Sequence, residues 1–271
     1  MDAATELRAG AAAVLCAAEP GVKVALAREL GNAAATLPVA PSMPAPPAAI
    51  PGRPLRPALV HPARVPRRSP NRPEGLAALL HAIAHIEFNA INLAADCAWR
   101  FDGMPREFHL DWVRIMAEEA YHFSLLSDLL ADMGHAYGDF DAHDGLWRMC
   151  EKTSGDIVAR LALVPRTLEA RGLDATPQIQ DKLRQVDSRA VKPYAARAVE
   201  VLDIILRDEV GHVAAGNHWY RWCCAREGLD PVAHYPAIAE RYAAPRLHPP
   251  FNEAARRMAG FSDEELAWLK G

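Results

Sequence analysis

The chain has few cysteines and no paired cysteine motif. Five cysteines occur in 271 residues, and no two of them are spaced as Cys-x-x-Cys. An odd number of cysteines without paired spacing indicates neither a disulfide framework nor a zinc knuckle. We therefore expect reduced thiols in a reducing compartment, and hence a cytoplasmic protein, for all five residues: Cys16, Cys97, Cys150, Cys223 and Cys224.

An excess of charge and a long apolar run near the N-terminus are missing as well. Thirty basic residues face 34 acidic ones, for a net charge of −4, which gives no electrostatic case for nucleic acid as the main ligand. The apolar run at residues 9–18 is too short to span a bilayer, and Asp2 and Glu6 precede it where a signal peptide carries positive charge. We expect no membrane association.

The composition supplies material for a helical core. Hydrophobic residues make up 51% of the chain and charged residues 24%, a soluble globular balance that excludes wholesale disorder. Aromatic residues contribute only 7%, whereas alanine is abundant, which favours helices with small residues at their contacts. We therefore expect an all-α protein.

Proline is concentrated in one segment. Residues 38–73 contain twelve prolines and six arginines. Because proline lacks a backbone N–H and fixes φ, this segment forms neither a helix nor a central strand. It is either a disordered linker or an extended arm lying on the folded domain. We favour the arm, with Leu59 and Val65 buried, since linkers carry few apolar residues.

The remaining composition divides the chain into parts. We expect an N-terminal helical extension at residues 1–36, a Pro/Arg-rich arm at 37–73, a bundle at 74–230 and a C-terminal extension packed on the bundle at 231–271. Gly21 and Gly31 should interrupt the helices of the N-terminal extension. In the C-terminal extension, Ser262 and Glu265 have the spacing of a helix capping box.

Apolar residues recur at helical spacing along the bundle. We expect long helices at residues 74–99, 106–133, 153–171 and 193–226, with a loop at 138–145 and a shorter helix at 178–188. Gly172 should end the third long helix. Pro165 should kink that helix or open a bulge in it. We expect no strand.

One glutamate falls on the apolar stripe of each long helix: Glu87, Glu119, Glu169 and Glu209. Burying a carboxylate without a partner costs several kcal/mol, so four such residues need a common explanation. A pair of divalent metal ions provides one, because four carboxylates neutralise two such ions. The alternative is a set of solvated glutamates, which their apolar neighbours argue against.

Two histidines complete the expected metal site. His122 and His212 each lie three residues after a stripe glutamate, on the same helical face and about one turn away. These are the two Glu-x-x-His sequences of the chain. Two single glutamates and two Glu-x-x-His motifs form the ligand set of ferritin-like dinuclear carboxylate sites. The expected metal ligands are Glu87, Glu119, His122, Glu169, Glu209 and His212.

Several longer motifs accompany these ligands, at residues 51–54 (Pro-Gly-Arg-Pro), 81–87 (His-Ala-Ile-Ala-His-Ile-Glu), 137–139 (Tyr-Gly-Asp), 143–147 (His-Asp-Gly-Leu-Trp), 163–166 (Leu-Val-Pro-Arg), 168–172 (Leu-Glu-Ala-Arg-Gly) and 207–212 (Arg-Asp-Glu-Val-Gly-His). With them, the chain from residue 51 onward resembles an uncharacterised bacterial family of ferritin-like proteins. The resemblance implies a di-metal carboxylate four-helix bundle and a relative of the di-iron oxygenases, the tRNA-modifying hydroxylases included. Ferritin-like second motifs often read Asp-Glu-x-Arg-His, whereas residues 118–122 read Glu-Glu-Ala-Tyr-His.

The residues next to the ligands are open to two interpretations. Glu118 and Asp208 stand immediately before a ligand glutamate, where ferritin-like proteins place the carboxylate that orients a metal-bound histidine. They are equally interpretable as solvated acids. His81 and His85 have the spacing of a helical zinc pair, but His85 lies about 200° of helical rotation from Glu87. We expect these two histidines to be a packed or surface pair instead.

Three functions fit this site. The first is an oxidase or oxygenase in which two iron ions activate O2 toward an unknown small-molecule or RNA substrate, with an electron-donor protein. The second is ferroxidase or iron handling, although the extensions disfavour a storage cage. The third is a metal-stabilised structural or interaction protein without turnover. Oxygen and imidazole donors accept iron, manganese or a mixed Mn/Fe pair. The sequence leaves a homodimer open.

Overall fold

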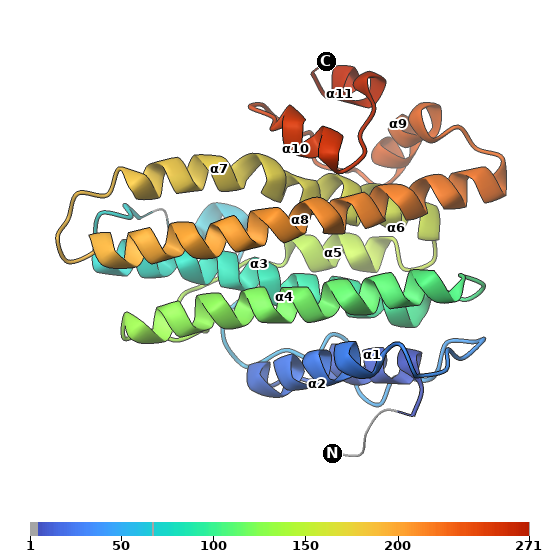
Figure 1. Ribbon diagram of the computed structural model, residues 1–271, viewed down its shortest axis with the longest axis horizontal. Helices are drawn as coiled ribbons and strands as arrows, with labels where there is room; N and C mark the ends of the chain where they lie inside the picture. The colour runs from blue at the N-terminus through green and yellow to red at the C-terminus, as the bar shows by residue number, and fades with distance from the viewer. Residues whose placement is uncertain (1–4, 67, 271) are drawn as a thin grey trace. The chain divides into compact units, whose positions relative to one another are not determined.

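The computed structural model describes residues 5–66 and 68–270, and in these ranges the chain is helical (Figure 1). Among the described residues there is no extended strand, only an isolated parallel bridge between Leu59 and Ala142. The prediction of an all-α protein is confirmed.

The chain divides into two compact units. The first unit contains the chain up to Trp147 together with Leu183–Val201. The second unit contains Arg148–Lys182 together with the chain from Leu202 onward. Three helices carry the chain from one unit to the other: α5 (Gly145–Lys152), α7 (Ala170–Arg184) and α8 (Lys192–Glu227).

Two long helices form the centre of the first unit. Helices α3 (Pro73–Arg100) and α4 (Arg106–Asp132) make an antiparallel hairpin and pack along their length (Figure 1). Pro73 occupies the first helical position, where its missing N–H removes no hydrogen bond. Gly103 in the connecting turn and Gly134 after α4 have φ of 71° and 76°, which glycine adopts without strain. Both helices agree with the predicted ranges to within a residue or two.

Two shorter helices cover this hairpin. Helix α1 (Leu7–Cys16) packs on α3, and α2 (Pro20–Ala33) packs on α4. The prediction that Gly21 and Gly31 interrupt the N-terminal helices is wrong, because both lie inside α2. Gly31 allows close packing instead: a Cβ at this position would lie 2.8 Å from the Cβ of Ala117 in α4.

The Pro/Arg-rich arm lies on the first unit and is held by its backbone. The Gly52 N–H donates to the Leu15 carbonyl at 2.8 Å. A Cβ on Gly52 would lie 2.1 Å from the carbonyl oxygen of Cys16, so the approach requires glycine. Further on, the Val60 N–H donates to the Ala142 carbonyl at 2.8 Å. The arm also includes a short turn of 3-10 helix, η1 (Pro62–Arg64).

Side-chain burial in the arm differs from the prediction. The expected burial of Leu59 is wrong, since this side chain is 41% exposed, and Leu55 is fully exposed. Val65 is half-buried. Backbone hydrogen bonds, rather than burial of Leu55 and Leu59, hold this part of the arm.

The second unit begins with an irregular helix. Helix α6 (Ile157–Leu163) passes into a π-helical segment, η2 (Val164–Glu169), and then into α7. Pro165 lies in η2, so the predicted bulge is confirmed. The Asp156 side chain caps α6 by accepting from the Ala159 N–H at 2.9 Å.

The predicted end of this helix at Gly172 is wrong, as is the separate helix at 178–188, because α7 runs through both positions to Arg184. A glycine within a helix lowers its stability by only about 1 kcal/mol relative to alanine. The burial of the neighbouring side chains Ala170 and Leu173 in the core of the second unit offsets this loss. The short helix α5 was also not predicted, since eight residues hold too little periodic pattern to distinguish a helix from a loop.

Three short helices complete the second unit: α9 (Pro231–Arg241), α10 (Glu253–Met258) and α11 (Asp263–Lys270). The predicted capping box is confirmed at the start of α11. The Ser262 N–H donates to the Glu265 carboxylate at 2.7 Å, and the Glu265 N–H donates to the Ser262 hydroxyl at 3.2 Å.

Helix α3 is long and apolar enough, by length and composition alone, to cross a membrane. However, 78% of its most apolar stretch is buried within the protein, and a core helix of a soluble protein meets the same criterion. The helix therefore gives no more than weak evidence for a membrane-spanning role.

Candidate metal centre

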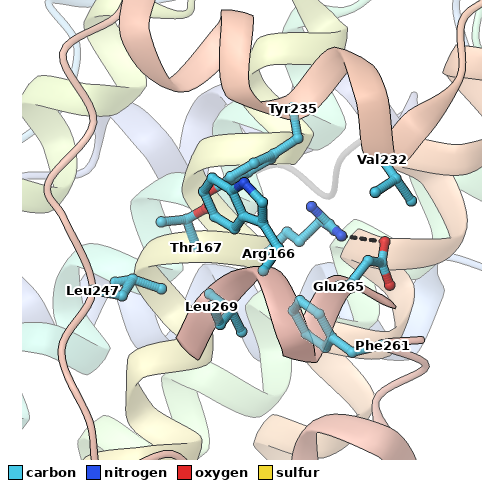
Figure 2. A pocket seen from close by; sticks show the side chains of 9 residues that line it. Arg166, Thr167, Val232, Tyr235, Leu247, Phe261, Glu265 and Leu269 are labelled. Atoms are coloured by element: carbon cyan, nitrogen blue, oxygen red, sulfur yellow. Dashed lines mark hydrogen bonds and ion pairs between the residues drawn. The ribbon is translucent and has the colours of Figure 1, made fainter. Parts of the chain in front are cut away.

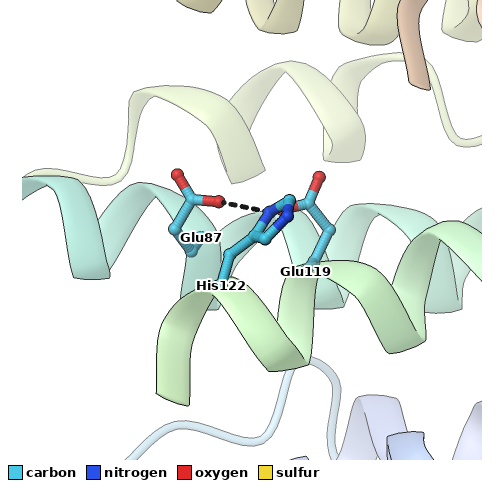
Figure 3. Close-up of side chains that lie close together, drawn as sticks. All are labelled: Glu87, Glu119 and His122. Atoms are coloured by element: carbon cyan, nitrogen blue, oxygen red, sulfur yellow. Dashed lines mark ion pairs between the residues drawn. The ribbon is translucent and has the colours of Figure 1, made fainter. Parts of the chain in front are cut away.

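The first unit brings together three of the six expected ligands. Glu87 on α3 and the Glu119–His122 pair on α4 converge in the hairpin (Figure 3). His122 Nδ1 lies 3.3 Å from a Glu87 carboxylate oxygen and 3.4 Å from a Glu119 carboxylate oxygen. The three side chains are buried, with exposed fractions of 3%, 0% and 0% for Glu87, Glu119 and His122. We call these three residues the α3–α4 cluster.

The spacing of the α3–α4 cluster suits a metal ion. One donor atom from each residue lies within 4.8 Å of the other two. First-row divalent ions bind nitrogen and oxygen donors at about 2.0–2.2 Å, so a small contraction brings all three donors onto one ion. Two carboxylates and an imidazole are ligands that iron, manganese and zinc accept. The residues present therefore fit a metal ion by both geometry and chemistry.

The α3–α4 cluster is electrostatically strained in the absence of metal. Burial, and then the neighbouring charge of Glu119, raise the pKa of Glu87 from its ordinary 4.5 to about 7. Burial alone would lower the pKa of His122, but its interactions with Glu119 and Glu87 outweigh burial and raise that pKa well above 6.5. Once the pH exceeds the pKa of Glu87, a protonated His122 between two ionised carboxylates leaves a net charge of −1 in a buried site. A bound cation would remove this excess.

The second unit holds the other Glu-x-x-His motif. Glu209 and His212 lie on α8, and His212 Nδ1 is 3.9 Å from a Glu209 carboxylate oxygen. Both side chains are buried, with exposed fractions of 7% and 0%. Glu169 is the last residue of η2 and is half-buried. The role of Glu169 as a ligand stays a prediction.

The π-helical segment packs closely on α8. A Cβ on Gly216 would lie 2.6 Å from the Cβ of Pro165, so α8 and η2 meet at a position where only glycine fits. About two turns earlier on α8, the carboxyl carbon of Glu209 lies 4.0 Å from the position of a Cβ on Gly172. Glycines on both helices thus let the backbone that carries Glu169 approach the helix that carries Glu209.

Glu118 and Asp208 have surface-type partners in the structure. Arg114 donates to Glu118 at 2.8 Å, one turn apart on α4, and the Glu118 side chain is 34% exposed. Arg207 donates to Asp208, its neighbour in sequence, at 2.8 Å, and the Asp208 side chain is 19% exposed. The role of these two acids in orienting metal-bound histidines stays a prediction.

His81 and His85 form a packed pair, as expected. The Gly138 N–H donates to His81 Nε2 at 2.8 Å, and His85 Nδ1 lies 2.9 Å from the Tyr137 hydroxyl. Burial lowers the pKa of each histidine to about 4, so both are neutral at pH 7. Their contacts join α3 to the segment after α4. The motifs at 81–87 and 137–139 therefore meet in space, a relation that spacing alone did not reveal.

A second motif pair also meets in the first unit. Arg53 in the arm donates to Asp144 at 2.9 Å, which joins the motif at 51–54 to the motif at 143–147. His85 Nε2 lies 3.1 Å from the His143 carbonyl oxygen in the same region. These polar contacts fix the arm and the segment after α4 to the helix that carries Glu87.

The chain matches a family model along residues 16–267. It belongs to the family described as "Protein of unknown function (DUF455)". An "Uncharacterized protein" of Haemophilus influenzae (strain ATCC 51907 / DSM 11121 / KW20 / Rd) is 49% identical to this DUF455 chain over 223 residues, which cover 80% of the chain and 75% of the relative. No solved structure matches the chain. The resemblance to an uncharacterised family is thereby confirmed, while the match says nothing of ferritin-like ancestry.

Proposed function

We propose that this protein is a ferritin-like di-metal carboxylate protein that binds two iron ions and acts as an O2-activating oxidase or oxygenase. The observation that carries the proposal is the α3–α4 cluster, in which two buried carboxylates and an imidazole converge within 4.8 Å. Ion pairing alone rarely explains a buried cluster of two carboxylates and one imidazole. Burying a charged side chain costs free energy unless the charge is paired or binds a metal.

The repeated motif supports two ions rather than one. Each unit contributes one Glu-x-x-His motif and one further glutamate, which gives six ligands in total. Four carboxylates and two imidazoles balance and coordinate two divalent ions and leave positions open for further ligands. Manganese or a mixed Mn/Fe pair would accept the same donors.

The residues of the chain have definable tasks in this function. Bound iron would supply the reduction of O2 and the oxidation of an organic substrate. Glu87 and Glu119 would neutralise the metal charge, and His122, deprotonated at Nδ1, would complete its coordination. Metal binding should therefore release protons, because at neutral pH the metal-free state holds a proton on His122 and, with a pKa of about 7, part of a proton on Glu87.

Metal content tests the proposal. We expect about two iron ions per chain after anaerobic reconstitution, because the six proposed ligands suffice for two ions. In two-metal sites the ions lie about 3.5–4 Å apart and share ligands. His122→Ala and His212→Ala should each lower the content at least several-fold. His218→Ala is the matched control, because this residue lies exposed on the same helix as His212. Unchanged content in either ligand variant would refute the assignment.

Oxygen consumption separates turnover from a structural role. The iron-loaded protein with a chemical reductant should consume O2 faster than the same amount of free iron, and His122→Ala should abolish the excess. A metal-loaded protein that consumes no more O2 than free iron would be a structural metalloprotein. Elution as a large cage in size-exclusion chromatography would instead indicate iron storage.

A further inference from the structure

A pocket in the second unit lies apart from the candidate ligands. It is small and partly open, with a cavity volume of about 20 Å³ that would hold a small polar group, and Figure 2 shows the side chains around it. Its walls are apolar, formed by three aliphatic and three aromatic side chains: Val232, Leu247, Leu269, Tyr235, Phe261 and Trp268. Ligand pockets typically combine apolar walls with a few placed polar groups, and this pocket has both.

The polar group of the pocket is a buried arginine. Arg166 is only 5% exposed, and its guanidinium lies 4.9 Å from the ring centre of Tyr220 and 5.1 Å from that of Tyr235. Nε donates to the Asn217 side chain at 2.8 Å, and Nη2 donates to the Glu265 carboxylate. In the described part of the chain, Nη1 has no acceptor. Figure 2 shows one guanidinium nitrogen directed at Glu265 and the other directed away from it.

The charges around this arginine do not balance. Glu265, the carboxylate that accepts from Arg166, also accepts from Arg221 at 2.9 Å. Two arginines thus share one buried carboxylate, which leaves an excess charge of +1 at the polar end of the pocket. No other acid lines the pocket. A ligand carboxylate, planar and with two oxygens, matches the geometry of the remaining donors of Arg166.

The apolar wall continues beyond the pocket. Tyr235, Leu247, Trp268 and Leu269 also line a neighbouring open groove, which extends past Ala239, Ala244 and Pro245 and carries one acid and one base, Glu240 and Arg246. The pocket has room for the head group of a ligand, and the groove, with about 500 Å³, has room for an elongated apolar chain. Trp268, which is 48% exposed, would be covered by such a chain.

We propose that this pocket binds an unbranched aliphatic carboxylate, with the carboxylate on Nη1 of Arg166 and the hydrocarbon chain along Leu247, Trp268 and Leu269. The charge excess selects an anion, and the apolar walls select a hydrocarbon body. This site is independent of the proposed metal function, since none of its residues is a candidate metal ligand.

Octanoate is the probe, tested on the full-length protein by isothermal titration and by ligand-observed NMR. We expect one saturable site per chain with a Kd of about 1 mM or tighter, a range that ligands of about ten heavy atoms reach in such pockets. Octan-1-ol lacks the charge and acetate lacks the chain, so each should bind at least tenfold more weakly. No saturation by octanoate up to about 10 mM, or equal binding of octan-1-ol, would overturn the proposal.

Two arginine variants form a matched pair. Arg166→Met removes the proposed contact and leaves Glu265 its second partner, Arg221. Arg221→Met removes the other arginine from the same carboxylate, but Arg221 does not line the pocket. We expect at least tenfold weaker octanoate binding for Arg166→Met and a change of less than threefold for Arg221→Met. Equal effects of both variants, or no effect of Arg166→Met, would overturn the assignment.

A third variant keeps the test valid if Arg166→Met fails to fold. Leu247→Trp fills the pocket from a half-buried position and leaves the arginines in place. It should abolish octanoate binding while the circular dichroism spectrum remains that of the wild type. A folded Leu247→Trp protein that binds octanoate as the wild type does would show that the ligand site lies elsewhere.

Discussion

Replacing Glu87 by glutamine should stabilise the metal-free protein at neutral and alkaline pH. Glu87 is 3% exposed, and burial together with the charge of Glu119 raises its pKa to about 7. Its negative charge therefore destabilises the folded state. Glutamine keeps the size of the side chain and retains an oxygen that accepts a hydrogen bond from His122. His122 also keeps Glu119, at 3.4 Å, as an ionic partner.

The sign and size of the effect follow from proton binding. A carboxyl with a pKa of 4.5 when unfolded and about 7 when folded binds its proton more tightly in the folded state. Its destabilising effect is thus absent below pH 4.5, grows as the pH rises to 7, and is complete above pH 7. The difference corresponds to about 3 kcal/mol. In a chain of this size it should raise the Tm of the variant by roughly 5–10 °C at pH 8.

Thermal and urea unfolding in the presence of chelator measure the effect. The gain in unfolding free energy for Glu87→Gln over the wild type should be close to zero at pH 4.5 and largest at pH 8. Glu74→Gln is the matched control, because this residue lies on the same helix with its side chain 66% exposed. It should change stability by less than about 0.5 kcal/mol at any pH.

Two results would contradict this reasoning. A Glu87→Gln protein that is less stable than the wild type at pH 8 in chelator would show that Glu87 serves as a structural partner of His122. A pH-independent gain would show that folding does not shift the pKa of the Glu87 carboxyl. With iron present the order should reverse, since the wild type has one more anionic ligand for the metal.

Two close backbone contacts give further predictions. Gly216→Ala places a methyl group 2.6 Å from Pro165 and should destabilise the protein by about 1–3 kcal/mol in urea unfolding. Gly211 lies on the same helix with open space around it, so Gly211→Ala should stabilise the protein by up to about 1 kcal/mol. Gly52→Ala directs a methyl group at the Cys16 carbonyl and should release the arm, which limited proteolysis would detect as new cleavage within residues 51–61. A proteolytic pattern identical to that of the wild type would show that the arm tolerates the methyl group.

The α3–α4 cluster was predictable from sequence because helical periodicity is regular. A fixed rotation per residue places His122 over Glu119, and a short turn makes α3 and α4 neighbours, so Glu87 on the apolar stripe must face them. The bulge at Pro165 was predictable for a similar reason, since proline removes a specific hydrogen bond of the helix. These features depend on local chemistry alone.

Other features depend on tertiary contacts that spacing does not encode. Gly172 has the sequence signature of a helix end, but buried neighbours continue the helix through it. The polar contact between Arg53 and Asp144 joins residues 91 positions apart. The pocket around Arg166 also depends on such contacts, since Arg166 and its partner Glu265 are 99 positions apart. The surplus donor follows from Arg221 sharing that acid.

The division into two units has a consequence for biosynthesis. The segment Leu183–Val201 completes the first unit. Within this segment, the Tyr194 hydroxyl donates to the Asp132 carbonyl, and Arg197 forms an ion pair with the Asp132 carboxylate at 2.7 Å. These residues leave the ribosome only after Arg148–Lys182, which belongs to the second unit. Neither unit can therefore finish folding before most of the chain is made, although domains commonly fold in order of synthesis. An expression product cut at residue 147 would lack the segment that closes its own unit, and we expect it to aggregate.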